Sequence, residues 1–471
     1  MKKLIKVLSL LAALSLLAAA CGSTIEEATD TVEEVVDEAT DTEDEEAMED
    51  EEAMEDEEAM EDEEAMEDEE AMADGEHLGD GSLGTVVVEA GAEVQIRSLN
   101  AITGDVAFLG VPNQRGIEQA VADYGDIQGF AVTSGAGLDD LCSADGGQAA
   151  ASQIIADEQI VGVIGTSCSG AAAAASPLLG DAGLVMISGS NTSPSLTSDQ
   201  QGNVGDGYSP GYYRTAHNDL FQGQAMAEYA FNELGLTSAA AIHDGDPYTF
   251  GLSDAFGTAF EALGGEFTAI TAIAKGDTDM VPVLTEIAAT SPEGLFFPLF
   301  QPESDFLADQ VRTVAGLEDV TLLSADASLN TDFLSLEQSE GIHFSGPDTR
   351  FGENTNQSTG KTAAEVLADY EAANGEVPSA PFWGHSYDAA ALLLDAIDAA
   401  SFVDGDGNLV IDRAGVREAL NGVSGYSGLI GTINCDEFGD CGSQKITIVE
   451  HLSSDDVDAS LANVTFEFAP E

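Results

Sequence analysis

The chain has 471 residues and a formal net charge of -75, because 88 Asp and Glu stand against 13 Lys and Arg. Nucleic-acid binding is excluded, since such surfaces need clustered Lys and Arg to meet phosphate. The charge has two parts. Residues 26–76 carry 30 of the acids and no Lys or Arg, and residues from 77 onward carry 58 acids against 10 bases. The body is therefore acidic in its own right, which favours solubility and repels anionic membranes.

The first residues are typical of an export signal. Three lysines stand in Met1–Lys6, the apolar run Leu8–Ala20 follows, and Cys21 comes directly after small residues. The run is too short to span a bilayer and fits a cleaved signal peptide. Leu17-Ala-Ala-Ala-Cys21 resembles a bacterial lipobox, although Ala18 stands where Leu is usual. The motif implies lipidation of Cys21 and an extracytoplasmic protein anchored to the cell membrane. An ordinary signal peptide with a chance cysteine is the alternative.

The next segment, residues 21–91, is expected to be an extended tether. Residues 46–72 repeat Glu-Glu-Ala-Met-Glu-Asp with a period of six, which matches neither a helix nor a heptad. Dense like charge with few large apolar groups predicts disorder. The repeated methionines do not indicate a copper site, because a self-repelling segment does not converge its sulfurs. They include Met48, Met54, Met60 and Met66.

The sequence predicts neither a metal nor a cofactor. The histidines are scattered, and no Cys-x-x-Cys pair is present, so a zinc site is not expected. The segment Asp404-Gly-Asp-Gly-Asn408 with Asp412 lacks the Gly at position six and the Glu at position twelve of a calcium loop, and we expect an ordinary turn. The four cysteines beyond Cys21 are an even number outside a reducing cytoplasm, which suggests disulfides. They are Cys142, Cys168, Cys435 and Cys441.

From about Ala92 the chain alternates apolar strand-like runs with amphipathic helical stretches. This alternation predicts doubly wound parallel sheets. About 380 residues exceed what one core usually holds, so two lobes are expected. Such sheets bind ligands beyond the carboxyl ends of their strands. There the turns Thr166–Gly170 and Gly189–Pro194 place Ser, Thr and Gly before helices, which is typical of an anion site. Simple helix N-caps are the alternative.

The chain from about Gln95 to Asp440 resembles the type I periplasmic binding proteins of ABC importers, especially the leucine/isoleucine/valine-binding branch. The resemblance rests on the order and spacing of Leu99–Asp105, Gly116–Asp123, Gly165–Ser169, Val185–Thr192, Arg214-Thr215, His243-Asp244, Tyr248 and Asp436–Asp440. It implies two parallel-sheet lobes joined by a three-crossing hinge near residues 217, 346 and 430. Residues 92–217 and 347–430 would form lobe 1, and residues 218–346 and 431–471 would form lobe 2.

The resemblance also implies a binding site and two disulfides. In the family, hydroxyls of the two turns hold a ligand carboxylate, and an acid on the opposite lobe holds its ammonium group. The matching positions give Ser169 and Thr192 the first role and Asp326 the second, where Glu is common in relatives. Phe300 stands where Tyr is expected. The full set of ligand-binding positions is Ser169, Ser190, Thr192, Asp219, Tyr248, Phe300 and Asp326. The family's disulfide matches Cys142–Cys168, and Cys435–Cys441 would form a second, smaller clip.

These features imply a lipoprotein that captures a small amino acid of the branched-chain or a related type and delivers it to an ABC permease. No catalysis is expected. Gly165-Thr-Ser-Cys-Ser169 only partly matches a Gly-x-Ser-x-Gly nucleophile elbow, and no His partner can be assigned. Two alternatives stay open. One is a binding protein for an amide, urea or short carboxylic acid, and the other is a ligand-sensing ectodomain that partners a signalling receptor.

Overall fold

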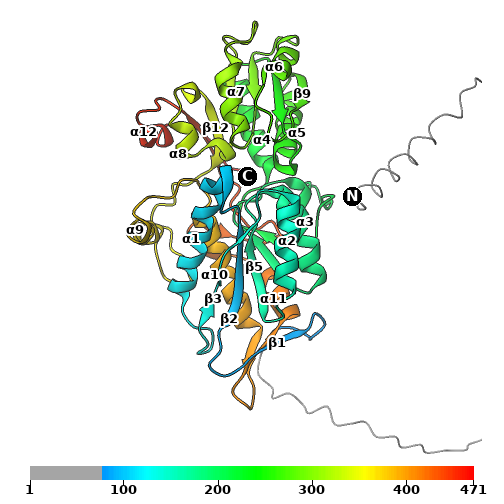
Figure 1. The fold of residues 1–471 in the computed structure, drawn as a ribbon, viewed down its shortest axis with the longest axis vertical. Coiled ribbons are helices and arrows are strands. Elements are labelled where there is room, and N and C mark those ends of the chain that lie inside the picture. The colour runs from blue at the N-terminus through cyan, green and yellow to red at the C-terminus, as the bar shows by residue number, and fades with distance from the viewer. Residues whose placement is uncertain (1–76, 471) are drawn as a thin grey trace, which may run out of the picture. The chain divides into compact units, whose positions relative to one another are not determined.

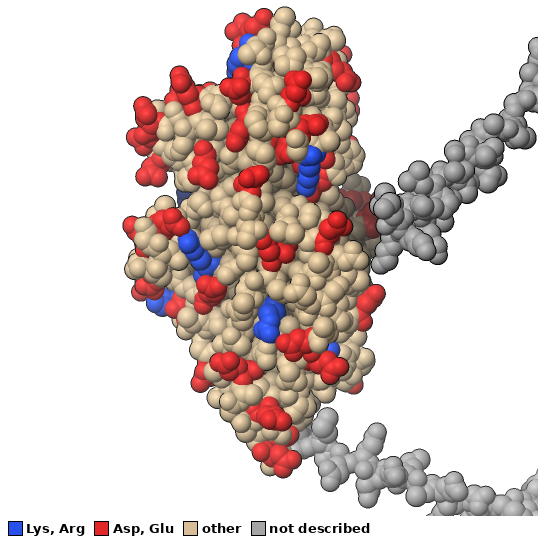
Figure 2. Space-filling view, viewed as in Figure 1, with Lys and Arg blue, Asp and Glu red and all other residues tan. Residues whose placement is uncertain are grey.

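The computed structural model describes residues 77–470. The signal segment, Cys21 and the methionine repeats lie outside these residues, and their predicted roles stay predictions. The described part contains two large sheets, each covered by helices (Figure 1). Within residues 77–470, no helix is long and apolar enough to cross a membrane. Acidic side chains are spread over the face shown in Figure 2, with few basic ones between them.

Lobe 1 is built on a sheet of parallel strands in the order β3-β2-β5-β6-β7, with β4 also paired to β2. Its strands are β2 (Val94–Asn100), β3 (Val132–Thr133), β4 (Leu138–Asp139), β5 (Ile160–Gly165), β6 (Val185–Ser188) and β7 (Tyr212–Arg214). Its helices are α1 (Ala107–Tyr124), α2 (Ala144–Ile155), α3 (Ser169–Asp181), α9 (Ala363–Asn374), α10 (Trp383–Ala399) and α11 (Arg413–Asn421).

Side chains of lobe 1 alternate between two hydrophobic cores. On β6, Val185 and Ile187 pack into the core formed with α1, α10 and α11, whereas Met186 packs into the core formed with α2 and α3. Every residue of β6 is buried. A strand buried on both faces is typical of a parallel sheet with helices on either side. The buried apolar runs of the sequence therefore specify the doubly wound layers.

Lobe 2 is built on a seven-stranded sheet in the order β18-β17-β12-β11-β10-β8-β9. Strands β8 to β12 are parallel, and β17 and β18 add an antiparallel edge. Its strands are β8 (Ser238–His243), β9 (Glu266–Ala272), β10 (Gly294–Phe296), β11 (Thr321–Ser324), β12 (His343–Pro347), β17 (Ile446–Glu450) and β18 (Val464–Phe468). Its helices are α4 (Asp219–Glu228) with the π-helical turn η3 (Tyr229–Glu233), α5 (Pro247–Ala262), α6 (Val281–Ala288), α7 (Glu303–Val311), η4 (Asp326–Ser328), α8 (Thr331–Leu334), η5 (Glu337–Ser339) and α12 (Val457–Leu461).

The chain passes between the lobes three times. The first crossing lies between the end of β7 and the start of α4, and the second follows the end of β12. The third lies between Cys441, whose N–H donates to the carbonyl of Arg214 in lobe 1 (3.0 Å), and the start of β17 in lobe 2. The prediction of two parallel-sheet lobes joined by three crossings is confirmed.

Two boundaries differ from the sequence expectation. Strand β1 (Thr85–Val88) pairs antiparallel with β14 (Leu409–Asp412), which also pairs with β13 (Ser401–Val403). The folded part therefore begins before Ala92, because Val86 and Val88 bury their side chains in the core of lobe 1. The third crossing comes later than residue 430, because β16 (Gly431–Ile433) forms a hairpin with β15 (Tyr426–Gly428) that belongs to lobe 1.

Candidate ligand-binding site

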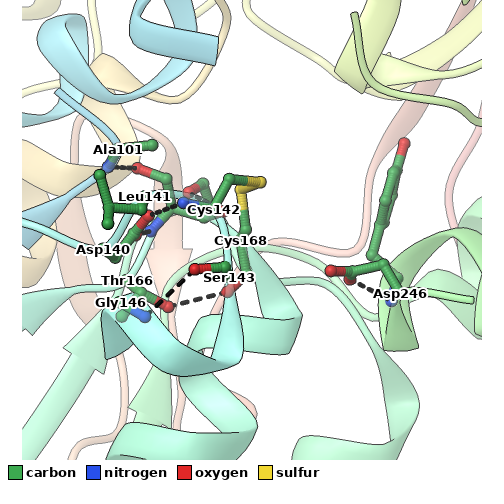
Figure 3. Close-up of a disulfide and its surroundings, with 12 residues drawn as sticks. Ala101, Asp140, Leu141, Cys142, Ser143, Gly146, Thr166, Cys168 and Asp246 are labelled. Carbon is green, nitrogen blue, oxygen red and sulfur yellow. Dashed lines mark hydrogen bonds between the residues drawn. A yellow bond between two sulfur atoms is a disulfide. The ribbon is translucent and has the colours of Figure 1, made fainter. Parts of the chain in front are cut away.

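The first turn of the candidate site joins β5 to α3 and is braced from a neighbouring loop. Asp140 accepts hydrogen bonds from the amide groups of Ser167 and Cys142, both at 2.7 Å, and the Cys142–Cys168 disulfide joins the same loop to the turn (Figure 3). Burial raises the pKa of the Asp140 carboxyl to about 7. Helix α3 then begins at Ser169 without a side-chain cap from Cys168. The positive end of α3 therefore lies at this turn.

The second turn follows β6 and is held by a buried arginine. Arg214 donates to the carbonyl of Ser193 (2.8 Å) and to Thr197 Oγ1 (2.6 Å), and it forms an ion pair with Asp440. The two turns meet directly, because the amide of Ser193 donates to Ser169 Oγ (3.3 Å). Thr192 is buried, and its hydroxyl has no hydrogen-bond partner of normal geometry.

Ser190, also predicted as a ligand-binding position, makes its hydrogen bonds within lobe 1. Its amide donates to Ser188 Oγ (3.1 Å), and its hydroxyl donates to the carbonyl of Ser167 (3.0 Å). Its hydroxyl also accepts from Asn113 Nδ2 (3.2 Å). The N–H and the side chain of Ser190 are thus used inside lobe 1, where they tie the two turns together.

Lobe 2 contributes two buried carboxylates. Asp326 lies in η4, and its Oδ1 accepts from Gln222 Nε2 (2.6 Å) and from the hydroxyl of Tyr248 (3.3 Å). Asp219 is the first residue of α4, and its amide donates to the carbonyl of Thr192 (3.0 Å). This backbone bond connects the start of α4 to the second turn of lobe 1.

Ionising either of these two buried carboxyl groups is costly. Burial raises the pKa of Asp326 to about 6. Burial, together with the charge of Asp326, raises the pKa of Asp219 well above its ordinary value. Neither oxygen of the Asp219 carboxylate has a hydrogen-bond partner of normal geometry in the described structure, although the neighbouring Thr192 hydroxyl lowers the pKa of that carboxyl. Burial likewise raises the pKa of Tyr248, so its hydroxyl stays a proton donor. A positive charge near these acids would lower the cost of ionising them.

An apolar surface adjoins these polar groups. The rings of Tyr248 and Phe300 lie 5.2 Å apart between centroids, and both belong to a hydrophobic cluster shared by the two lobes. From lobe 1 this cluster includes Leu109 and Cys168, and from lobe 2 it includes Ala327. A group bound beside Asp326 is thus close to aromatic and aliphatic side chains.

At the edge of the site the lobes approach closely. Lys275 Nζ lies 3.0 Å from Asp246 Oδ2 and 3.4 Å from the carbonyl oxygen of Cys142, so it contacts both lobes. Asp246, drawn across from the disulfide in Figure 3, comes so near α3 that a β-carbon on Gly170 would lie 2.5 Å from its Oδ2. Lys275 also lies 5.6 Å from the centroid of the Phe300 ring.

The structure thus brings Ser169 and Thr192 together on lobe 1 and Asp219, Tyr248, Phe300 and Asp326 together on lobe 2. Sequence reasoning missed Gln222, Asp246 and Lys275. Gln222 could have been found, because it follows Asp219 by three positions and so shares a helix face with it. Asp246 and Lys275 stand on loop ends with no comparable signal.

Both predicted disulfides are present, Cys142–Cys168 and Cys435–Cys441. Within residues 77–470, no group of three or more His, Cys, Asp or Glu side chains is placed to hold a metal ion. The segment after Asp404 forms a turn in which the Asp404 carboxylate accepts from the amides of Asp406 (2.9 Å) and Asn408 (2.8 Å). Its oxygens are thus used within the turn.

Two doubly wound lobes joined by three crossings define the fold of a two-lobed solute-binding protein. The chain belongs to the periplasmic binding protein family, whose family model matches residues 93–453. It is 27% identical to the Leu/Ile/Val-binding protein homolog 3 of Brucella melitensis over 362 residues, covering 76% of this chain and 91% of the relative.

Solved structures share the fold. The leucine-binding protein LivK of Thermotoga maritima matches with a TM-score of 0.66 and 24% identity, covering 80% of this chain and 99% of that one. The branched-chain amino acid transporter substrate-binding protein LivJ of Streptococcus pneumoniae, in complex with isoleucine, matches with a TM-score of 0.63 and 20% identity. That match covers 80% of this chain and 98% of the LivJ chain.

Proposed function

We propose that this protein is the solute-binding component of an ABC importer and captures a small amino acid with an apolar side chain, of the branched-chain or a related type. One observation carries the proposal. The buried Asp219 of lobe 2 adjoins the second turn of lobe 1 through its amide bond to the carbonyl of Thr192, and it lies near enough to the buried Asp326 for the charge of Asp326 to raise its pKa. The two lobe 1 turns offer Ser169, Thr192 and the positive end of α3. This pairing of charges suits a zwitterion.

Asp326 and Asp219 would receive the ligand ammonium group. Each buried carboxylate without a cation is costly, as their raised pKa values indicate. An ammonium group between them offsets that cost and adds charge-assisted hydrogen bonds. The hydroxyl of Tyr248, which already donates to Asp326, would keep that carboxylate oriented.

Ser169 and Thr192 would hold the ligand carboxylate. Thr192 offers a buried hydroxyl that adjoins the Asp219 carboxyl without a hydrogen bond of normal geometry. Ser169 stands at the first position of α3, where the helix dipole favours an anion. Ser190 would act indirectly, by holding the two turns together through its bonds to Ser188 and Ser167.

Phe300 and Tyr248 would contact the ligand side chain. Their ring contact and the neighbouring Leu109 supply an apolar surface, and Phe300 has no hydroxyl to satisfy. The names of the Brucella melitensis relative and of the LivK and LivJ structures point to leucine, isoleucine and valine as first candidates.

Export, anchoring through Cys21 and delivery to a permease complete the proposal. The motif after the apolar segment supports lipidation at Cys21, and the LivJ name supports a transporter partner. We further propose binding without turnover, because the hydroxyl of Ser169 is engaged by a backbone amide and not by a histidine.

A thermal-shift screen tests the ligand class. The purified protein is heated with each of the twenty amino acids, urea, small amides and short carboxylic acids. Leucine, isoleucine or valine should raise the melting temperature, since a ligand that binds only the folded state stabilises it. The Asp326→Asn variant should lose the response, and Asp254→Asn, at an exposed site of α5, should keep it. A response only to urea, amides or carboxylic acids would replace the amino-acid proposal.

A further inference from the structure

Gln222 of α4 is a fully buried carboxamide with hydrogen bonds on both of its ends. Its Nε2 donates to Asp326 Oδ1 (2.6 Å) and lies 3.1 Å from the carbonyl oxygen and 3.0 Å from the hydroxyl of Ser345. Its Oε1 lies 2.5 Å from His217 Nε2. A polar side chain at this depth is costly unless it is hydrogen-bonded, so its hydrogen-bond partners indicate its role.

The partners fix the direction of each hydrogen bond. The carboxamide oxygen can only accept, so His217 must carry its proton on Nε2. Burial lowers the pKa of His217 to about 4, so the ring is neutral at pH 7 and its Nδ1 is unprotonated. The amide hydrogens of Gln222 therefore point at Asp326 and Ser345. A carboxamide held this way cannot turn its oxygen toward Asp326.

Two of these partners, His217 and Ser345, lie in or next to the first two interlobe crossings. His217 belongs to the first crossing, between β7 and α4, and Ser345 lies in β12, whose last residue leads into the second crossing. Gln222 therefore connects the acid proposed to bind the ligand ammonium with both of these chain segments.

We propose that Gln222 is the positioning residue that keeps the Asp326 carboxylate ionised and aimed at the ligand ammonium, with His217 and Ser345 fixing its own orientation. This rests on the proposed function, in which Asp326 holds that ammonium group. A neutral donor suits the task, because a hydrogen bond to a carboxylate stabilises its charged form without neutralising it. The charge thus stays available to the ligand.

The other titratable groups around Asp326 do not supply this stabilisation. Asp219 of α4 is an acid whose own pKa is raised by burial and by the charge of Asp326, so it supplies no positive counter-charge. Tyr248 of α5 donates a longer bond, at 3.3 Å against 2.6 Å for Gln222. His217 is neutral and acts on Asp326 only through Gln222. The hydrogen bond from Gln222 is therefore the main local support of the charged carboxylate.

The test compares Gln222→Met with Gln224→Met. Gln224 lies on the same helix, is exposed, and bonds only with Glu228 in the described structure (2.8 Å). Calorimetry with L-leucine is run from pH 5 to pH 8. Gln222→Met should weaken binding about tenfold at pH 7, the effect of a lost hydrogen bond to a charged group. It should also move the acidic fall in affinity upward by about one pH unit. Gln224→Met should match the wild type, and an unchanged pH profile in Gln222→Met would overturn the proposal.

A second measurement needs no ligand. The carboxyl carbon of Asp326, identified as the NMR signal lost in Asp326→Asn, is titrated in the ligand-free protein. Its midpoint should rise in Gln222→Met, and further in Gln222→Glu, which keeps the shape but places a second acid beside Asp326. Unmoved midpoints overturn the proposal. Raised midpoints in a protein that does not bind leucine would support the role of Gln222 and count only against the proposed ligand.

Discussion

The substitution Asp326→Asn tests the ammonium site, because it removes a charge and keeps the shape of the side chain. Losing one partner of a buried charge pair costs about 2–5 kcal/mol. Asp219 remains nearby and retains some attraction for a cation, so we expect a cost of about 2–3 kcal/mol. This corresponds to about 30- to 150-fold weaker binding of the amino acid.

The assay is titration calorimetry with L-leucine at pH 7.5, with Asp254→Asn as the matched exposed control. The wild-type profile supplies a second readout. Because burial raises the pKa of Asp326 to about 6, ammonium binding requires loss of a proton below that pH, and affinity should fall as pH drops through 6. The Asp326→Asn variant should lose much of this dependence. Binding within twofold of the wild type, with the same pH profile, would refute the assignment.

Four further predictions follow from other residues. Thr192→Ala should weaken ligand binding by about 1–3 kcal/mol in calorimetry, less than Asp326→Asn, and unchanged affinity would remove Thr192 from the site. The contribution of Asp140 to the melting temperature of the ligand-free protein should fall between pH 5 and pH 7.5. The pKa of Asp140 is raised in the folded state, so stability falls as pH rises from about 4 through about 7, and Asp140→Asn should flatten that slope. Replacing both Cys142 and Cys168 by Ser should lower the free energy of unfolding by about 3–4 kcal/mol in denaturant melts, and an unchanged value would show that the link is not stabilising. Cys21→Ala should move the protein from the membrane to the soluble fraction, and retention in membranes would argue against lipidation.

The two-lobed fold was predictable because it depends on local patterns. Apolar runs buried on both faces, such as β6, alternate with helices, and this order is enough to predict parallel sheets. The pairing of β1 with β14 was not predictable in the same way. A four-residue strand separated from its partner by most of the chain carries no local signal of where it pairs.

Some residues of the candidate site were also predictable from the sequence, and others were not. Ser169 and Thr192 follow neighbouring strands at recognisable turns, so their spacing predicts that they lie near each other, whereas the role of Asp326 is implied only by the family resemblance. Gln222 gave only the weak signal of its helical spacing from Asp219, because an isolated Gln in a helix is usually exposed. Ser190 is among the predicted ligand-binding positions, and its N–H donates to Ser188 Oγ, a detail of turn geometry that sequence spacing does not encode.

The central claim is that the site recognises both charges of an amino acid, and a comparison of three molecules tests it most directly. Calorimetry is run with L-leucine, with 4-methylpentanoate, which lacks the ammonium group, and with 3-methylbutylamine, which lacks the carboxylate. Lost pairing at either end should weaken binding by at least about 30-fold, so both analogues should bind far less tightly than leucine. If 4-methylpentanoate bound as tightly as leucine, the buried acids Asp219 and Asp326 would not bind an ammonium group. That result would contradict recognition of an amino acid through both of its charges.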